Sequence, residues 1–282
     1  MTSRNILFFA ALAAASLAAA QRRPDPPKSV RLYVFENGSI KGLDPALFRF
    51  KKEELAEVDF TVISYLIVHP NGTLMWDAGV VPDSQLPADG KPFTQGASTV
   101  TKALKPQLAS AGYTPADINY LAMSHYHSDH TANANQFAGS TWIVQQLERD
   151  YMFAEKPQGI IQPGHYNLLK DSKTIILKNV EDYDVFGDGT VVLKSTPGHT
   201  PGHQVLALKL AKAGPVVLAG DLYHYPEERT TGRTPTFEFN AEQSAASRAK
   251  IEAFVKQNEA QLWIEHDIAT HAKLKRAPAY IE

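Results

Sequence analysis

The segment SHYHSDH, residues 124–130, decides how this 282-residue chain is interpreted. It contains three histidines and one aspartate, and it follows an apolar run, residues 118–123, that we predict to be a strand. Side chains alternate along an extended segment, so its first two histidines point the same way and can bind one ion. The aspartate and the third histidine come where the chain turns into a predicted helix, and there they can face a second ion.

Three further candidates also follow predicted strands. His199 lies in the Pro-Gly-His segment after the strand that ends at Lys194, Asp221 follows the apolar run PVVLA, and His266 follows QLWI. The pattern predicts two metal sites that share a bridging carboxylate. We assign His125, His127 and His199 to one ion, Asp129, His130 and His266 to the other, and Asp221 to both. Imidazole and carboxylate ligands favour two zinc ions, and iron, manganese and cobalt stay open.

Composition narrows the classes of function. The chain has 28 Lys and Arg against 30 Asp and Glu, so a broad nucleic-acid-binding face is not expected. It has no cysteine, which excludes disulfides, thiolate nucleophiles, iron–sulfur clusters and cysteine-ligated zinc. Hydrophobic residues make up 44% of the chain, enough for a sizeable core, and the length allows one large domain or two small ones.

The N-terminus has the features of a secretory signal. Arg4 precedes an uncharged run, Ile6 to Ala20, that ends in small residues. We predict a signal peptide over residues 1–20, export to the periplasm or the cell exterior, and no stable membrane insertion after cleavage. The alternative is an uncleaved anchor. Residues 21–28 are expected to be a mobile, proline-rich lead-in, and residues 29–282 a single catalytic domain.

The pattern of apolar residues in the rest of the chain predicts a series of strands followed by a helix, and this order occurs twice. This order predicts an α/β (α+β) domain in which two sheets are covered by helices. We expect a turn at Asn37-Gly38, a hairpin through residues 59–76, a lid or rim loop over 80–98, and a helix that carries Val100, Leu104, Leu108 and Ala111 and ends at Gly112. The second half contributes strands at 174–177, 191–194, 205–210, 216–218 and 261–264, and a helix at 241–258.

The order HxHxDH, His, Asp, His resembles the metallo-β-lactamase superfamily over most of the chain. Within it, the chain is most similar to N-acyl-homoserine lactonases, in VRLYVFENGSI, NGTLMWDAG, SHYHSDHTANANQF, STPGHTPGHQ and HDIATHAKLKRAPAYIE. The resemblance implies a four-layer αββα sandwich and a quorum-quenching lactonase, in which a metal-bridged hydroxide opens the lactone ring of an acyl-homoserine. Hydroxyacylglutathione hydrolases typically add a helical C-terminal domain, for which the 16 residues after His266 leave no room.

One position departs from the family pattern. Many of these lactonases carry a tyrosine three residues after the bridging aspartate, where this chain has His224 between Tyr223 and Tyr225. We expect His224 and Asp129 to act in catalysis, with a register shift to either neighbouring tyrosine left open. Further substrate contacts are expected from Tyr126 and Ser128, and an apolar channel from the loops around 36–50, 80–98 and 152–166, with candidates Phe48, Phe50, Phe93, Met152 and Phe153.

Other polar residues receive supporting roles or none. His69 is expected at the surface, and His203 is expected to support the loop of His199. For Asp77, bonding to a metal-binding histidine and simple turn capping stay equally open. His165 and His271 have no partner recognisable in the sequence.

Several rival functions stay open at this stage. They are another dinuclear ester, thioester, organophosphate or phosphodiester hydrolase, a mononuclear iron sulfur dioxygenase, and a non-catalytic metal-binding module. The native metal, the preferred acyl length, the 3-oxo preference and a homodimer are not fixed by the sequence.

Overall fold

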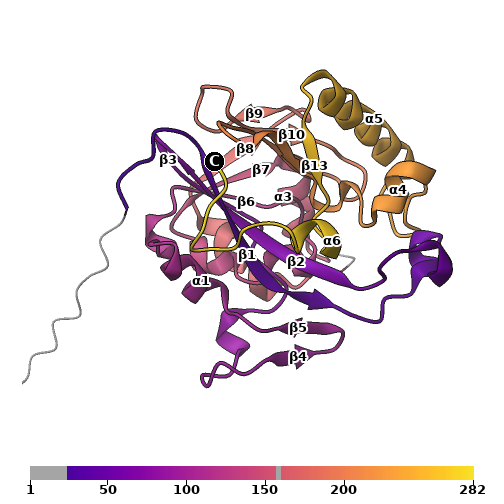
Figure 1. Ribbon diagram of the computed structural model, residues 1–282, viewed down its shortest axis with the longest axis horizontal. Coiled ribbons are helices and arrows are strands. Elements are labelled where there is room, and N and C mark those ends of the chain that lie inside the picture. The colour runs from indigo at the N-terminus through magenta and orange to yellow at the C-terminus, as the bar shows by residue number, and fades with distance from the viewer. Residues whose placement is uncertain (1–23, 157–159) are drawn as a thin grey trace, which may run out of the picture.

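The computed structural model describes residues 24–156 and 160–282, which form two β-sheets packed face to face (Figure 1). The predicted signal segment lies outside the described residues. The first sheet has the strand order β4-β5-β1-β2-β3-β6-β7-β8. Its strands are β1 (Arg31–Ile40), β2 (Phe60–His69), β3 (Gly72–Trp76), β4 (Phe93–Gln95), β5 (Ser98–Val100), β6 (Tyr120–Ala122), β7 (Thr141–Gln145) and β8 (Thr174–Leu177).

The second sheet is smaller and has the order β13-β12-β11-β10-β9. Neighbouring strands are antiparallel except for β12 and β13, which pair in parallel because α5 connects them. The strands are β9 (Tyr183–Asp184), β10 (Val191–Ser195), β11 (Gln204–Leu210), β12 (Gly214–Leu218) and β13 (Gln261–Trp263).

Helices cover the outer face of each sheet. The helices are α1 (Leu104–Ser110), α2 (Ser128–Thr131), α3 (Gln146–Met152), α4 (Pro226–Thr231), α5 (Ala241–Gln257) and α6 (Ile268–His271). In Figure 1, α5 lies along the outside of the second sheet, while α1 lies on the opposite side of the molecule. Ile251 of α5 packs on Val205 and Val217. Leu108 of α1 packs among outer-face residues of the first sheet.

The alternation of side chains along β1 explains why both of its faces are buried. Leu32 and Val34 point between the sheets, into a core shared with Leu206 and Leu218 of the second sheet. The intervening Tyr33 and Phe35 belong to the outer core beneath α1. The αββα sandwich predicted from the sequence is therefore confirmed.

Two local predictions are wrong. Asn37-Gly38 is no turn, because β1 runs on to Ile40 and takes up the extra residue as a bulge between Glu36 and Gly38. Gly38 has a φ of +131°, and a side chain there would press on the carbonyl oxygen of Thr99. Val100 lies in β5 rather than in the helix that follows it.

The predicted hairpin over β2 and β3 is confirmed, with antiparallel pairing from Tyr65–Trp76 to His69–Gly72. The short strand β9 has no sequence signal of its own, since it pairs through only two residues with β10. Of the predicted lead-in, Pro27 is buried and Pro24 lies against Gly112.

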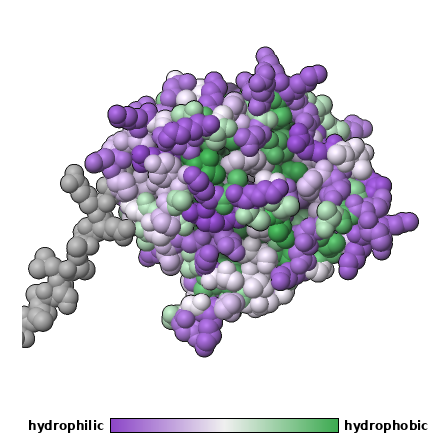
Figure 2. Space-filling view, in the orientation of Figure 1, coloured by the Kyte–Doolittle hydropathy of each residue, from purple (hydrophilic) through white to green (hydrophobic). Residues whose placement is uncertain are grey.

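The exposed surface carries mostly polar side chains on the face seen in Figure 2, where apolar residues show only in small patches between hydrophilic ones. Within the described residues, no helix combines the length and the apolarity needed to cross a membrane.

Candidate metal centre

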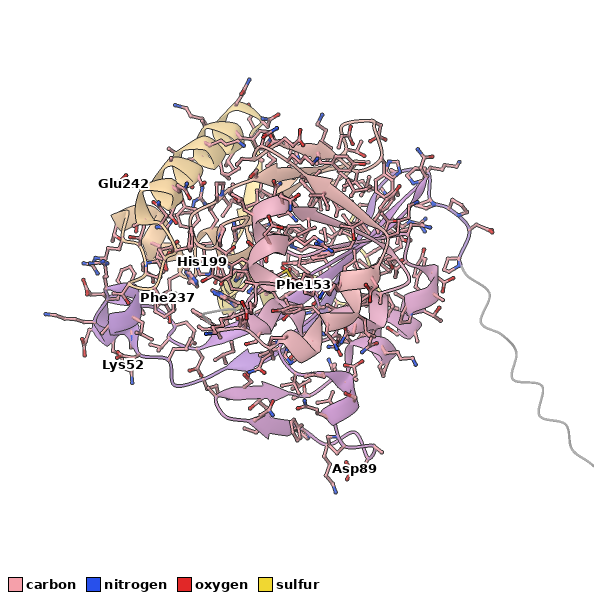
Figure 3. All side chains as sticks on the ribbon, turned by 180° about the vertical axis from the view of Figure 1, so that it is seen from behind. Lys52, Asp89, Phe153, His199, Phe237 and Glu242 are labelled. Carbon is pink, nitrogen blue, oxygen red and sulfur yellow. The ribbon has the colours of Figure 1, made fainter. Side chains whose placement is uncertain are left out.

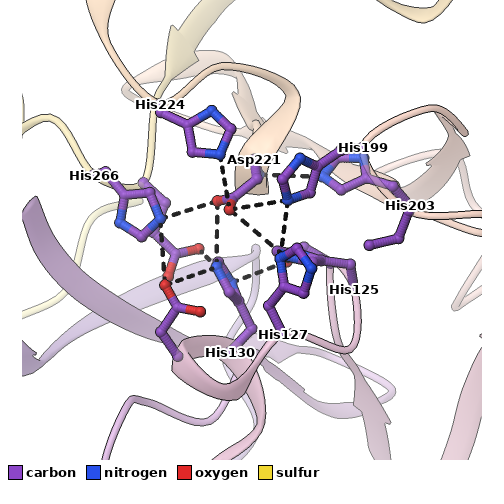
Figure 4. Close-up of polar contacts among 12 residues, drawn as sticks. His125, His127, His130, His199, His203, Asp221, His224 and His266 are labelled. Atoms are coloured by element: carbon purple, nitrogen blue, oxygen red, sulfur yellow. Dashed lines mark hydrogen bonds and ion pairs between the residues drawn. The ribbon is translucent and has the colours of Figure 1, made fainter. Parts of the chain in front are cut away.

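The seven predicted ligands come together at one edge of the sandwich, where strands of both sheets end (Figure 4). The segment 125–130 follows β6 of the first sheet and runs into α2. His199 follows β10, Asp221 lies in the short 3-10 turn Gly220–Leu222 after β12, and His266 follows β13. Parallel and antiparallel pairing in the two sheets thus brings side chains that are 141 positions apart in sequence, from 125 to 266, to one place.

Asp221 lies between two groups of histidines. Its Oδ2 is 3.5 Å from His125 Nε2 and 3.4 Å from His199 Nε2. Its Oδ1 is 3.2 Å from His130 Nε2 and 3.1 Å from His266 Nε2. The two oxygens of one carboxylate therefore face different imidazole groups, as a ligand that bridges two ions would.

The structure brings the seven predicted ligands together in two groups. Within each group, the ligand atoms lie within 4.8 Å of one another. In the first, His199 Nε2 is 3.0 Å from His127 Nδ1. In the second, Asp129 Oδ2 is 3.7 Å from His130 Nε2 and 3.6 Å from His266 Nε2. The groups are His125, His127, His199 and Asp221, and Asp129, His130 and His266.

Buried polar atoms in this cluster have the arrangement that bound cations need. Among the described residues, five buried ligand atoms make no hydrogen bond of good geometry. One is His199 Nδ1, on the side of Glu238, and the other four are His125 Nε2, His130 Nε2, His266 Nε2 and Asp221 Oδ1. Buried polar atoms are normally paired, so this convergence needs an explanation. Imidazole nitrogens and a carboxylate are the ligands that zinc and related divalent ions take, and the residues present fit such ions.

Electrostatics keeps the central carboxylate ionised. Burial alone would raise the pKa of Asp221, but the imidazoles of His130, His266 and His224 outweigh it and hold the pKa well below its usual range. An ionised carboxylate at the centre of the cluster favours the approach of cations.

A buried carboxylate orients His130 from behind. Asp77 Oδ2 is 3.2 Å from His130 Nδ1, and Asp77 Oδ1 accepts hydrogen bonds from the backbone nitrogen and the hydroxyl of Ser124. Glu265 Oε2 lies 3.5 Å from the same His130 nitrogen. Of the two roles left open for Asp77, the structure shows the bond to a ligand histidine, which fixes the ring and leaves Nε2 facing Asp221.

Two further ligand histidines, His266 and His199, also face protein oxygens with their Nδ1 atoms. His266 Nδ1 donates to the carbonyl oxygen of Thr61 at 2.9 Å, and its ring stacks on Phe60 with centroids 4.2 Å apart. His199 Nδ1 lies 3.5 Å from the buried carboxylate of Glu238, which in turn accepts a hydrogen bond from Ser244.

His203 supports the site as predicted. Its Nε2 accepts the backbone N–H of Asp221 at 3.1 Å, and its Nδ1 faces the hydroxyl and carbonyl oxygens of Thr196. Burial lowers the pKa of His203 to about 3, so its ring is neutral and Nε2 can accept.

His69 was expected at the surface, and this prediction is wrong. It is 3% exposed, its ring stacks on Phe186 at 4.2 Å, and Nε2 lies 2.8 Å from Asp188. The segment after β9 covers it, which the local turn pattern could not indicate. His271 is buried too and donates to the carbonyl oxygen of Ile264.

His224 lies beside the cluster in an aromatic enclosure. Its Nε2 is 3.2 Å from Asp221 Oδ2, and its Nδ1 is 3.4 Å from Glu228 Oε1. Phe48 and Phe237 have ring centroids 5.0 and 5.8 Å from the His224 ring. Burial would lower the pKa of His224, but the two carboxylates raise it to about 10, so the ring carries a proton on both nitrogens in the metal-free protein.

The neighbouring tyrosines use their hydroxyls elsewhere. The Tyr223 hydroxyl donates to Glu252 on α5, and the Tyr225 hydroxyl donates to the carbonyl oxygen of Val58. Neither geometry supports the register shift that would replace His224 by a tyrosine. The hydrogen-bond partners of the two tyrosine hydroxyls could not be predicted from the sequence, because they depend on how α5 and residues 55–60 pack.

A small opening leads to the first group of ligands. A cavity of about 240 Å³ is lined by His127, His199 and aromatic and aliphatic side chains. Figure 3 shows His199 and Phe237 close together at this site, and Asp89 far from them, in the loop that precedes β4. The apolar lining residues are Tyr126, Tyr151, Ile160, Phe237 and Phe239.

This lining differs from the predicted channel. Phe48 packs on His224, but Phe93 packs against Val80 and Val100, and Phe153 packs on Trp142 and Tyr166 in the core. Met152 is likewise buried in the outer core. Tyr126 does line the opening, and Ser128 lies at the start of α2, where its backbone N–H donates to the carbonyl oxygen of Ile160, another lining residue.

Sequence reasoning missed the buried carboxylates that surround the site, namely Glu148, Glu228, Glu238 and Glu265. Glutamates are usually exposed, so burial was not the expected state. The one available signal was the position of Glu265 beside His266 after a predicted strand.

Comparison with known proteins agrees with this geometry. Residues 59–257 match the model of the metallo-beta-lactamase superfamily, and the chain belongs to that superfamily. Within it, the chain is 28% identical to N-acyl homoserine lactonase AttM of Azorhizobium caulinodans over 90% of this chain and 99% of the relative. It is 30% identical to an N-acyl homoserine lactonase of a Bacillus species over 79% of this chain and 88% of the relative.

Solved structures give the same result. A quorum-quenching N-acyl homoserine lactone lactonase superposes with a TM-score of 0.72 and 25% identity, over 90% of this chain and 99% of that one. An N-acyl homoserine lactone hydrolase, solved with N-hexanoyl-L-homoserine at its catalytic metal center, gives a TM-score of 0.71 and 25% identity, over 90% and 100%.

Proposed function

We propose that this protein opens the lactone ring of N-acyl-homoserine lactones by metal-dependent hydrolysis and so acts in quorum quenching. The observation that carries the proposal is Asp221, whose two oxygens face two separate groups of imidazoles at 3.1 to 3.5 Å. When bound, a pair of divalent ions supplies a nucleophile derived from water at neutral pH and polarises the carbonyl oxygen.

The relatives make the lactone the best-supported substrate. Curated relatives that span nearly the whole chain are N-acyl homoserine lactonases, and a similar structure carries a ring-opened product. The aromatic and aliphatic lining of the opening beside His127 suits the acyl chain of such a substrate.

The chain's own residues then have the following roles. His224, with Nε2 directed at the cluster and Glu228 behind it, can donate a hydrogen bond to the lactone carbonyl oxygen. Asp129 is the most exposed of the seven candidate ligands, with its side chain 15% exposed. Its carboxylate can accept the proton of the attacking water-derived nucleophile and pass that proton to the ring oxygen as the carbon–oxygen bond breaks.

The deciding experiment measures ring opening of a homoserine lactone series by the wild type and by His127→Ala, with metal content counted in both. We expect the wild type to release open acyl-homoserines and to hold two metal ions per chain. We expect His127→Ala to keep its fold, lose metal and lose nearly all activity. Thioester turnover with inert lactones would favour another hydrolase of the superfamily instead.

Two finer points complete the proposal. We propose zinc as the native metal, because the ligand set is imidazole and carboxylate, and elemental analysis of protein purified without added metal tests it. We propose export on the basis of residues 1–20, and N-terminal sequencing of the protein recovered outside the cytoplasm, starting after about Ala20, tests that.

A further inference from the structure

Glu148 is a buried carboxylate for which the proposed reaction has no use. It lies on α3, a short helix on the outer side of the first sheet, and is 3% exposed. In sequence it is 18 positions from the nearest candidate ligand, His130. A buried carboxylate is costly unless its oxygens are hydrogen-bonded, so its partners reveal what it does.

Its partners lie on two separate segments of the site. Glu148 Oε1 accepts the backbone N–H of Tyr126 at 2.8 Å, and Oε2 accepts the backbone N–H of Gly202 at 2.7 Å. The hydroxyl of Thr200 lies 3.0 Å from Oε1 and 2.9 Å from Oε2. One side chain therefore joins the segment after β6 to the segment after β10.

These bonds flank ligands on both sides. Tyr126 stands between His125 and His127, and Thr200 directly follows His199. Gly202 permits the close approach of α3 to this segment, because a side chain at position 202 would meet Glu148 Cβ at 2.6 Å and the Glu148 backbone nitrogen at 2.7 Å. Glycine at this position lets α3 lie directly against the His199 segment.

We propose that Glu148 is a positioning residue that sets the spacing between His125 and His127 on one side and His199 on the other, and thereby the metal affinity of the first ligand group. The inference rests on the proposed metal site. The two segments meet where His199 Nε2 lies 3.0 Å from His127 Nδ1, and a small change in their separation alters the geometry that an ion needs.

A carboxylate fits this role where an amide does not. All three partner groups donate to Glu148, and two of them are backbone N–H groups that cannot turn round. Glutamine would offer one acceptor oxygen and one NH₂, so its NH₂ would face a backbone N–H of Tyr126 or Gly202. One of the two segments would lose its bond, with the other still held.

The test compares zinc binding by the full-length wild type and Glu148→Gln, using competition with a chromophoric chelator. We expect the variant to bind zinc about 10- to 100-fold more weakly, with a lower kcat for lactone opening at saturating zinc. Asp150→Asn is the matched control, since Asp150 is an exposed carboxylate on the same helix, and we expect it to bind zinc like the wild type.

Three outcomes would overturn the inference. Glu148→Gln could lower only the unfolding temperature and leave zinc affinity and kcat unchanged, which would make Glu148 merely structural. Asp150→Asn could weaken zinc binding equally. The wild type could bind no zinc, which would remove the proposed function as well. A wild type that binds zinc but leaves lactones intact contradicts the proposed function alone, and the affinity comparison still decides on Glu148.

A second pair of variants applies if Glu148→Gln does not fold. Thr200→Val removes only the hydroxyl that spans both carboxylate oxygens, and Thr200→Ser keeps it. We expect Thr200→Val to weaken zinc binding several-fold and Thr200→Ser to restore it. Equal zinc affinities for the valine and serine variants would contradict the role assigned to Glu148.

Discussion

His224 and its carboxylate neighbours show how a single side chain acquires its role from its surroundings. On one side its Nε2 faces Asp221, and on the other its Nδ1 faces Glu228, which also pairs with Arg248 at 2.6 Å. Arg248 is itself held by the carbonyl oxygens of Leu222 and Arg233. The ring is therefore fixed from behind by a buried ion pair, with its free edge toward the cluster.

This arrangement gives a first prediction. His224→Ala should lower kcat for lactone opening by about 100-fold and leave metal content unchanged, because it removes a hydrogen-bond donor but none of the seven candidate ligands. Steady-state kinetics with metal analysis measures both. Tyr225→Phe should stay within about twofold of the wild type, because the Tyr225 hydroxyl donates to Val58. A larger loss of kcat in Tyr225→Phe than in His224→Ala would assign the hydrogen bond to the lactone carbonyl to Tyr225 instead.

A second prediction concerns Glu148 and pH. Burial raises the pKa of Glu148 to about 7 from 4.5, although hydrogen bonds from Thr200, Gly202 and Tyr126, together with nearby His199, oppose the shift. A carboxyl whose pKa is higher in the folded state stabilises the fold at low pH and loses that contribution as pH rises through about 7. In metal-free protein, the free energy of unfolding of the wild type, relative to that of Glu148→Gln, should fall by about 2 to 3 kcal/mol between pH 5 and 8, because ionising the buried carboxyl costs desolvation free energy that its hydrogen bonds offset only in part. Denaturant unfolding at each pH measures it, and a constant difference would contradict the prediction.

At the scale of elements, the segment that carries His199 is held against the start of α5. The backbone nitrogen of Asn240 donates to the carbonyl oxygen of Gly198, and the hydroxyl of Ser247 donates to that of Pro197. Gly198 has a φ of +141°, and a side chain there would overlap the backbone nitrogen of Ser244. This helix therefore positions a ligand without contributing one.

A third prediction follows from this contact. Gly198→Ala should destabilise the protein by about 2 to 4 kcal/mol and weaken metal binding, because the added methyl group pushes the His199 segment off α5. Gly232→Ala is a matched comparison, since Gly232 also has a positive φ, of +71°, but nothing lies within 4 Å of the added carbon. It should cost about 1 kcal/mol and leave metal binding intact. Thermal unfolding and zinc titration of both variants would reveal any reversal of this order.

How far the sequence predicts the structure depends on whether the signal is local. The alternation of His125 and His127 after a strand, and a polar residue after each later strand, were sufficient to predict the two ligand groups. The burial of Glu148 and Glu228 was not predictable, because it depends on how α3 and α4 pack on segments distant in sequence. The turn predicted at Asn37-Gly38 is wrong for a related reason, because the same residue pair is compatible with a bulge inside a long strand.

At the scale of the whole molecule, the two sheets contribute separately to one centre. The first sheet supplies the 125–130 segment, and the second supplies His199, Asp221 and His266. The buried residues between the sheets hold these groups in place, with Leu32 and Val34 facing Leu206 and Leu218. An ion bound by ligands from both sheets therefore links the halves of the sandwich.

A fourth prediction follows from this link. Removing metal with a chelator should lower the unfolding temperature by roughly 5 to 10 °C, because zinc at about 100 times its dissociation constant stabilises the folded state by about 2.7 kcal/mol. Re-addition of zinc should restore it. Calorimetry on the same sample before and after chelation measures the change, and an unaltered transition would show that the ligands are not bridged across the sheets.

The seven candidate ligands are divided between the N-terminal and C-terminal parts of the chain, which determines when both ligand groups are complete. Residues up to the end of β8 contain four of the seven candidate ligands, namely His125, His127, Asp129 and His130, and lack the bridging Asp221. A nascent or clipped polypeptide with only its N-terminal sheet assembled would thus have no complete chelating pocket. Both ligand groups are therefore complete only when the C-terminal third of the chain has folded against the N-terminal sheet.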